Sequence, residues 1–414
     1  MNVSLVCFTH NDHNLLKQGL LALPEWTLLP REIIVVDDAS NEKFLPPAEL
    51  SEQAALPALR IIRTPHRLGY AGAKNLGLSA ATSRFLLSMD ADICPCPDWL
   101  ECCLPLAARS EIGLVSTPII AACGEHLFGR YMTLTYSFHV GTKGKVGFIP
   151  GALWLMRREL WEELGGYDGY NGDAGEDDYL CKQLSRRALG LWIEPTARAF
   201  ECRPMTRLQM VTRGWKWHGA SVYQALTEGR KLDEAVNVLL YSLHHRMLRS
   251  RQANPLFLYY DLLYLAYALF DLLQNSRQSS PRLCPAGSPT PSALPKNNLG
   301  CHPQPALSSG DYGQVASPHV TTPSRIHSAT DVPSSPLPHL LASFQPWLIK
   351  FPALGQALTA DMAALGFPDA GAFILEKSSL SQHPGLNIAQ ALAFAFDQST
   401  LNTLEQNMEE ILTD

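Results

Sequence analysis

Short runs of apolar residues, each followed closely by polar residues, constrain the fold of this chain more than any other feature. The runs cover residues 3–8, 33–36, 59–62 and 85–87, and a helical pattern over residues 72–81 separates the last two. A run that is apolar throughout, without alternation, predicts a strand covered on both faces. Strands and helices that alternate in this way predict an α/β fold with a mainly parallel sheet flanked by helices.

Polar side chains follow three of these runs. Thr9 and Asn11 come after the first run, Asp38 after the second, and Asp90 and Asp92 after the fourth. Ligands of open α/β sheets bind beyond the carboxyl ends of the strands, where the connecting loops gather. We therefore expect these side chains to line one binding site, although they are far apart in the sequence.

The glycine-rich loops that hold nucleotide phosphates in other α/β folds do not occur at the corresponding places. Residues 9–12, Thr-His-Asn-Asp, stand where a dinucleotide-binding fold needs G-x-G-x-x-G, and residues 69–75 lack the Gly-Lys-Ser/Thr of a phosphate loop. A phosphate group near Asp90 and Asp92 would need a cation between them. Mg²⁺ is typically held by one or two carboxylates together with substrate phosphates, and these acids at alternate positions suit that ion.

The complete series of motifs resembles the family 2 glycosyltransferases, which are inverting enzymes that use a nucleotide-diphosphate sugar and have a GT-A fold. The resemblance covers residues 3–200 and rests on residues 35–40, 69–77, 89–100, 151–152, 165–168 and 175–178. It implies a GT-A type nucleotide-diphospho-sugar transferase fold followed by a helical extension. It also implies a nucleotide-sugar donor and a divalent cofactor, Mg²⁺ or Mn²⁺.

The resemblance implies a role for each residue that matches a motif. Asp177 would be the general base, with Glu176 beside it in the catalytic pair, and Asp92 and Asp90 would bind the metal. The donor would contact a further set of residues: Thr9, Asn11, Asp38 at the nucleotide base, Lys74, Asp90 at the ribose or sugar, and Gly151.

Three consecutive acids, Glu176, Asp177 and Asp178, open a helical pattern. Repulsion between them predicts that at least one pKa is raised, which makes a better base. Acids in the first turn of a helix are also favoured by the helix dipole alone, so capping is the alternative interpretation. The chain departs from the family at Tyr179, which stands where many members have an acid, and at residues 200–203, which lack a metal-holding histidine.

The 33 Lys and Arg against 39 Asp and Glu give a net charge of -6, which excludes a dedicated nucleic-acid-binding protein.

Composition divides the chain into four parts. Residues 276–338 hold 12 prolines and 12 serines and are expected to be a disordered linker. We expect a glycosyltransferase domain over 1–205, a helical extension over 206–275 on or near it, and a small acidic helical module over 339–414. Helical patterns in that module cover 354–365, 388–396 and 401–412.

An apolar segment over residues 256–273 follows a basic stretch over 198–251. Eighteen helical residues span about 27 Å, which is short for a bilayer core, and Asp261 and Asp271 interrupt the segment. Two interpretations stay open: a helix in the protein core, or peripheral contact of residues 198–273 with anionic lipid at the inner face of a membrane. The lack of a secretory signal in residues 1–8 and ten cysteines predict a cytoplasmic protein.

These patterns together predict transfer of a single sugar from a nucleotide-diphosphate sugar, a UDP-sugar in the first instance, to a saccharide or lipid-linked acceptor, as in polysaccharide biosynthesis at the cell envelope. Two alternatives stay open. A nucleotidyltransferase on a related fold would use the same metal-binding carboxylates, and a degenerate sugar-binding protein would keep the fold without catalysis.

Overall fold

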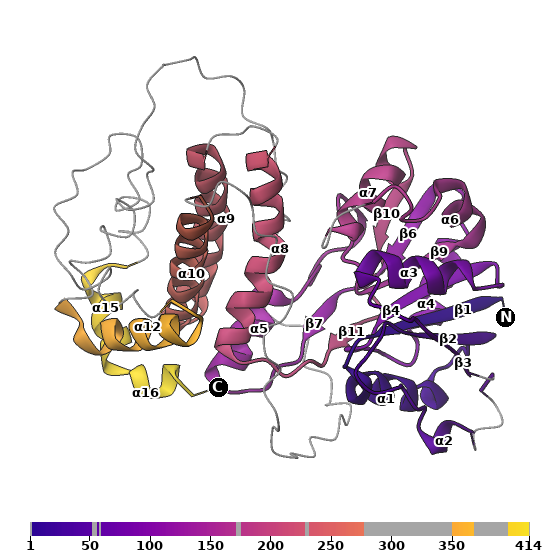
Figure 1. Ribbon diagram of the computed structural model, residues 1–414, viewed down its shortest axis with the longest axis horizontal. Coiled ribbons are helices and arrows are strands. Elements are labelled where there is room, and N and C mark those ends of the chain that lie inside the picture. The colour runs from indigo at the N-terminus through magenta and orange to yellow at the C-terminus, as the bar shows by residue number, and fades with distance from the viewer. Residues whose placement is uncertain are drawn as a thin grey trace.

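The computed structural model describes residues 2–51, 56–57, 59–170, 175–227, 232–276, 350–367 and 396–413. Within these ranges the chain forms an α/β body and a helical body, and helix α8 (Arg207–Thr227) lies on the side of the helical body that faces the sheet (Figure 1). The linker expected over 276–338 and the helix expected over 388–396 fall outside the described residues, apart from the first residue of the linker and the last of the helix.

The α/β body is built on an eight-stranded sheet in the order β3-β2-β1-β4-β9-β6-β10-β8. Strands β1 to β4 run parallel, β9 is antiparallel to both its neighbours, and β8 is antiparallel to β10. Their bounds are β1 Val3–Thr9, β2 Glu32–Asp37, β3 Leu59–Arg63, β4 Phe85–Asp90, β6 Ile112–Ser116, β8 Gly144–Val146, β9 Leu153–Arg157 and β10 Gly190–Ile193. The predicted mainly parallel sheet is therefore confirmed.

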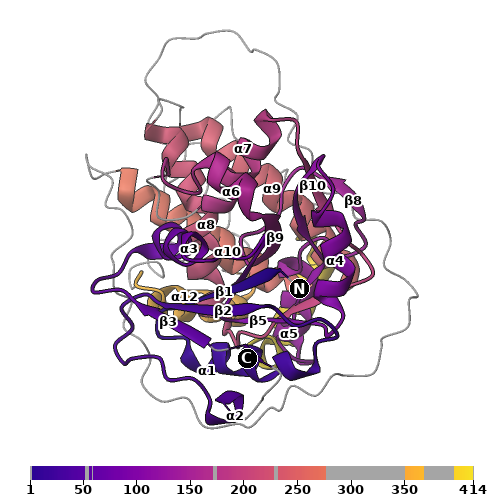
Figure 2. The same ribbon diagram turned by 90° about the vertical axis from the view of Figure 1, so that its right-hand side faces the viewer.

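Helices cover both faces of this sheet (Figure 2). One face packs on α1 (His13–Leu21) and α4 (Trp99–Ala107), and the other on α3 (Gly69–Ser79), α6 (Arg158–Leu164) and α7 (Glu176–Arg186). Every residue of β1 is buried, because alternate side chains enter the two opposite cores. The continuous apolar runs of the sequence reflect this double burial.

Two short helices and a second sheet complete the α/β body. The helices are α2 (Ala48–Ser51) and the 3-10 helix η1 (Leu23–Glu25), and α5 (Leu127–Tyr136) leads toward the helical body. The second sheet has the order β5-β11-β7, with β5 Ile93–Pro95, β7 Ile119–Ala121 and β11 Ala199–Glu201. Because β5 begins directly after Asp92, this small sheet fixes the loop beyond β4.

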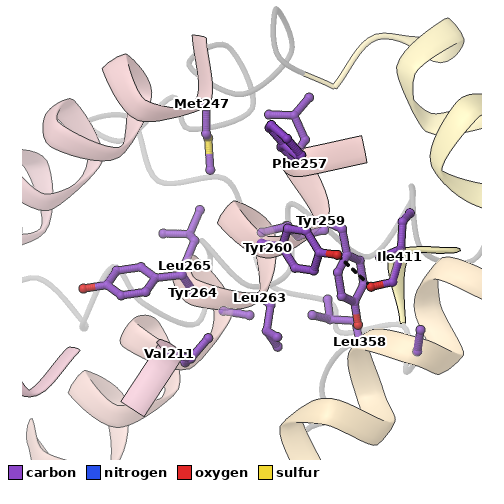
Figure 3. Packing of buried hydrophobic residues seen from close by; sticks show 14 of the residues in the cluster. Val211, Met247, Phe257, Tyr259, Tyr260, Leu263, Tyr264, Leu265, Leu358 and Ile411 are labelled. Atoms are coloured by element: carbon purple, nitrogen blue, oxygen red, sulfur yellow. Dashed lines mark hydrogen bonds between the residues drawn. The ribbon is translucent and has the colours of Figure 1, made fainter. Parts of the chain in front are cut away.

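The helical body joins two segments that are far apart in the sequence. Its first segment comprises α8, α9 (Leu232–Ala253), η2 (Pro255–Phe257) and α10 (Leu258–Ser276), and its second comprises α12 (Pro352–Ala364), α15 (Gln398–Gln406) and α16 (Met408–Ile411). They share one hydrophobic core (Figure 3). The Tyr260 hydroxyl donates to the Ile411 carbonyl at 2.8 Å, and Arg207 donates to both oxygens of Asp361 at 2.9 Å. The helical extension and the C-terminal helices thus pack as one unit.

The apolar segment that the sequence singled out is the central helix of this body. The stretch Pro255–Leu272 is long and apolar enough to cross a membrane, yet 83% of it is buried by other parts of the protein. Its Asp261 is paired with Arg246 at 2.6 Å and accepts a hydrogen bond from Tyr131 at 2.8 Å. This packing is that of a core helix. The peripheral membrane contact and the cytoplasmic location stay predictions.

Candidate active site

The carboxyl ends of three parallel strands meet at one edge of the sheet. Register pairs Thr9 of β1 with Asp37 of β2, and Phe8 of β1 with Asp90 of β4. Asp38 follows β2 directly, and its N–H donates to the Thr9 carbonyl at 2.8 Å. The structure therefore brings together the strand-end residues that the sequence predicted to share a site.

Lys74 of α3 joins the end of β4 to the start of α7. It is 1% exposed, and its ammonium donates to the Gly151 carbonyl at 2.9 Å and to Glu176 Oε1 at 3.1 Å. Asp90 Oδ1 lies 3.3 Å from the same nitrogen. An ammonium has three N–H donors, so these three oxygens account for all of them. Lys74 is therefore a buried connector between these segments, and its contact with the nucleotide stays a prediction.

The acids around Lys74 have different protonation behaviour. Burial raises the pKa of Asp90 to about 7, and the charges of Asp92 and Glu176 contribute although Lys74 opposes them. Burial also disfavours the charged form of Glu176, but the charge and hydrogen bond of Lys74 outweigh it and lower the pKa. The pKa of Asp177 is raised by burial and by the charge of Glu176. The predicted effect of crowded acids is therefore present at Asp177.

Gly151 lies where a side chain would disrupt this arrangement. An added Cβ would come within 2.8 Å of Lys74 Nζ, 3.1 Å of Glu176 Oε1 and 3.4 Å of Asp177 Cβ. The Gly151 N–H donates to Asp177 Oδ2 at 3.1 Å, while its carbonyl accepts from Lys74. Its backbone thus orients both the connector and the candidate base, and a direct contact of Gly151 with the donor stays a prediction.

Asp38 holds the loop that leads into α3. Its Oδ1 accepts hydrogen bonds from Thr64 Oγ1 at 3.0 Å and Leu68 N at 2.7 Å, and its Oδ2 accepts from Gly69 N at 2.9 Å. A carboxylate has about four acceptor positions, so roughly one is left for a ligand such as a nucleotide base. The neighbouring Asp37 accepts hydrogen bonds from Ser40 N at 3.1 Å and Phe44 N at 3.0 Å, so its side chain holds the turn that follows β2.

The loop after β1 packs against the loop after β2. Asn11 has a positive φ of 64° and accepts a hydrogen bond from Asn41 N at 2.8 Å, while its own N–H donates to Ser40 Oγ at 2.9 Å. The hydroxyl of Thr9 is buried and has no hydrogen-bond partner among the described residues. Both residues therefore lie beside Asp38, at the end of the site where a nucleoside was expected.

Asp92 is bound by two arginines that the sequence reasoning did not assign to the site. Its Oδ2 accepts from Arg203 Nε at 2.6 Å and lies 3.4 Å from Arg213 Nη2. Burial would raise the pKa of Asp92, but the two guanidinium charges lower it. Arg203 follows β11 within residues 200–203, where the family's histidine is missing, and Arg213 lies on α8. The excess of basic residues over 198–251 was the available sequence signal.

The metal expected at Asp90 and Asp92 can be tested against the ligands that the chain offers. Across the described ranges, His, Cys, Asp and Glu side chains form no group of three or more that could hold a metal ion. Mg²⁺ usually completes its shell with waters and substrate phosphates, so two carboxylates are sufficient when a donor is bound. The residues therefore fit a metal that arrives with a diphosphate.

Three ring side chains at α5 have contacts that fix this helix. Tyr131 is completely buried in the helical core and donates to Asp261. Tyr136 donates to the Met210 carbonyl at 3.4 Å, and the His126 side chain caps the start of α5.

A mainly parallel sheet whose carboxyl edge gathers Asp38, Asp90 and Asp92, with further acids at the start of α7, defines the class of GT-A folds. Residues 4–165 match the family model described as glycosyl transferase family 2. The predicted family and GT-A fold are confirmed. The matched range ends before Glu176, Asp177 and Arg203.

Two curated relatives show how far the similarity extends. The pre-mycofactocin glycosyltransferase of Mycobacterium tuberculosis is 30% identical over 174 residues, which cover 40% of this chain and 36% of that protein. Polypeptide N-acetylgalactosaminyltransferase 15 of Mus musculus is 39% identical over 118 residues, which cover 28% of this chain and 17% of that protein. The chain therefore spans about a third or less of the length of these relatives.

The chain also has a lower similarity to a solved structure. The mannosyltransferase PcManGT from Pyrobaculum calidifontis, in complex with GDP-Man and Mn²⁺, is 23% identical, with a TM-score of 0.42 over 68% of this chain and 76% of that chain.

Proposed function

We propose that the protein is an inverting glycosyltransferase that moves one sugar from a nucleotide-diphosphate sugar, a UDP-sugar in the first instance, to a hydroxyl of a saccharide or lipid-linked acceptor. The observation that carries the proposal is the buried network around Lys74. It joins Asp90, at the donor end of the site, to Glu176 and Asp177 at the start of α7. One site thus contains carboxylates for a donor and a separate acid with a raised pKa.

Asp177 is the general base of the proposed reaction. It removes the proton of the acceptor hydroxyl while the hydroxyl oxygen attacks the anomeric carbon from the side opposite the diphosphate. The new C–O bond forms as the bond to the diphosphate breaks, and the diphosphate leaves with the electron pair. Glu176 suits this role less, because its charge is paired with Lys74 and its pKa is lowered.

The charges of the site favour a cation beside the donor. Six carboxylates and three cationic side chains gather there: Asp12, Asp90, Asp92, Glu176, Asp177 and Glu201 with Lys74, Arg203 and Arg213. A diphosphate adds further negative charge. Mg²⁺ or Mn²⁺ held by Asp90, Asp92 and the donor phosphates would neutralise the charge that develops on the leaving group.

Removing the metal or Asp92 should have the same consequence. We expect excess EDTA and Asp92→Ala each to lower the rate of sugar transfer by at least about a hundredfold, because the leaving group loses its counter-charge. When no acceptor is present, the rate of donor hydrolysis should fall by the same factor. The measurement is release of nucleoside diphosphate from UDP- and GDP-sugars with Mn²⁺, with circular dichroism to verify folding. Wild-type rates in Asp92→Ala would reject this role.

The same assay separates the alternatives. A nucleotidyltransferase would consume a labelled nucleoside triphosphate and leave nucleotide sugars intact, whereas a degenerate binding protein would release nothing from either compound. Turnover of a nucleotide sugar alone supports the proposed function.

The pH profile of the reaction should reflect Asp90. Because its pKa in the free protein is raised to about 7, Asp90 takes up a proton below that pH and loses the charge that attracts the donor's cation. We expect kcat/KM for the donor to fall below pH 7 by about tenfold per unit when a single proton is involved. At saturating donor the fall in kcat should occur at lower pH. A flat kcat/KM profile between pH 5.5 and 8 would contradict the assignment.

A further inference from the structure

Arg203 connects three segments that are distant in the sequence. Its Nη1 and Nη2 donate to the two oxygens of Asp12 at 2.9 and 2.8 Å, and its Nε donates to Asp92 Oδ2 at 2.6 Å. Asp12 belongs to the loop between β1 and α1, and Asp92 lies between β4 and β5. The planar guanidinium suits such fork-shaped pairing, so Arg203 ties the nucleoside end of the site to the diphosphate end.

The backbone of β11 places Arg203 at this point. Strand β11 pairs antiparallel with β5, with Glu201 opposite Ile93, and the Cys202 N–H donates to the Asp92 carbonyl at 2.7 Å. Arg203 is the next residue, and its side chain is one-quarter exposed. The position is therefore fixed by strand pairing, while the guanidinium group stays within reach of the site.

Arg203 also determines the charge that a metal ion meets at Asp92. Asp92 is 5% exposed. Its Oδ2 accepts from Arg203 Nε and also lies 3.4 Å from Arg213 Nη2. A divalent ion that approached this carboxylate alone would lie close to two guanidinium groups, and like charges in a partly buried site repel strongly. The negative charges of a bound diphosphate would offset that repulsion.

We infer that Arg203 is a positioning residue of the donor site, which ties Asp12 to Asp92 and keeps divalent metal away from Asp92 until a nucleoside diphosphate is bound. The inference rests on the proposed function and adds a dependence of metal binding on the nucleotide: metal and nucleotide bind together, and metal alone binds poorly. Arg203 thus opposes metal binding in the free protein, because its charge lies beside Asp92.

The test measures Mn²⁺ binding without any turnover. Titration followed by the electron paramagnetic resonance signal of free Mn²⁺ should show weak binding to the wild-type protein, and tighter binding once UDP or GDP is added. In Arg203→Gln, Mn²⁺ affinity without nucleotide should rise by about tenfold or more, because one positive charge is lost beside Asp92. The enhancement by nucleotide should shrink correspondingly.

Arg203→Lys separates charge from geometry. Lysine keeps the positive charge but lacks the fork that holds both oxygens of Asp12. Mn²⁺ binding without nucleotide should therefore stay weak, while affinity for UDP with Mn²⁺ should fall several-fold. If Arg203→Gln does not fold, as judged by circular dichroism, this variant decides: unchanged UDP affinity would overturn the inference.

Arg207→Gln is the matched control. It breaks a similarly fork-shaped pair, with the 5% exposed Asp361 of α12 in the helical body. Its Mn²⁺ binding should equal that of the wild type. If Arg203→Gln and the wild type bind Mn²⁺ with equal affinity in the absence of nucleotide, the inference is wrong. If the wild type binds neither UDP nor GDP in the presence of Mn²⁺, the proposed function itself is wrong.

Discussion

Asp177→Asn should lower kcat for sugar transfer by about 10²- to 10⁴-fold, because a general base contributes about that much to the rate. The affinity for a nucleoside diphosphate should be retained, since Asp177 lies on the acceptor side in the proposed reaction. Its own hydrogen bonds are to the backbone: Oδ1 accepts from Asp178 N and Oδ2 from Gly151 N. The measurement compares kcat with the dissociation constant for UDP. A large loss of kcat without loss of affinity identifies a residue that acts in the transition state.

Asp178→Asn provides the control for this substitution. Asp178 is the next residue of the same helical turn, but its side chain is 52% exposed and pairs with Lys182 on the surface. Such surface pairs contribute little, so kcat should stay within about twofold of the wild type. Glu176→Gln tests the other candidate: if Glu176→Gln loses kcat while Asp177→Asn does not, the base is Glu176 and the proposed role of Asp177 is wrong.

The residues at the carboxyl edge of the sheet could be predicted from the sequence, because the ends of the strands alone determine which residues lie there. The runs at residues 3–8 and 33–36 became β1 and β2, and parallel pairing then placed Thr9 opposite Asp37 without any information from side chains. Asp90 followed by the same logic, since Phe8 lies opposite it. Local hydrophobicity and the geometry of parallel strands were sufficient for this part of the site.

The connections between the strand ends could not be predicted in this way. Lys74 is 77 residues from Gly151 and 102 from Glu176, and Arg203 is 111 residues from Asp92 and 191 from Asp12. No periodicity relates residues over such separations. The family resemblance implied that Lys74 contacts the donor, and only the packing of α3 on β1 and β2 shows that the ammonium is enclosed by protein oxygens.

The helical body shows the same limit on a larger scale. The helical patterns after residue 350 contain apolar residues, but the sequence does not identify the segment against which they pack. They join a shared core that contains α10, whose apolar sequence, interrupted by Asp261 and Asp271, had suggested either a core helix or a membrane-surface helix. Contacts such as that from Tyr259 to Asp361, 102 residues away, show that α10 packs in this core, while contact with a membrane stays a prediction.

Lys74→Met should produce the largest loss of stability in the site. Methionine keeps much of the side-chain volume but removes the cation, which leaves Asp90 and Glu176 without their shared partner in a buried position. Removing one partner of a buried ion pair reduces the free energy of unfolding by about 3–5 kcal/mol. Transfer should be lost as well, since the ammonium holds the Gly151 carbonyl beside Asp177.

The pH dependence of this variant distinguishes a lost charge from a packing defect. Without Lys74, the pKa of both acids should rise in the folded protein, so the folded state binds more protons than the unfolded state and stability increases as the pH falls. Urea unfolding at pH 5.5 and pH 8 should therefore show a smaller deficit at the lower pH. Lys182→Met, which removes a 65% exposed lysine from a surface pair, should change stability by no more than about 1 kcal/mol at either pH. A deficit in Lys74→Met that is equal at both pH values would show that packing, and not the charge of Lys74, stabilises the site.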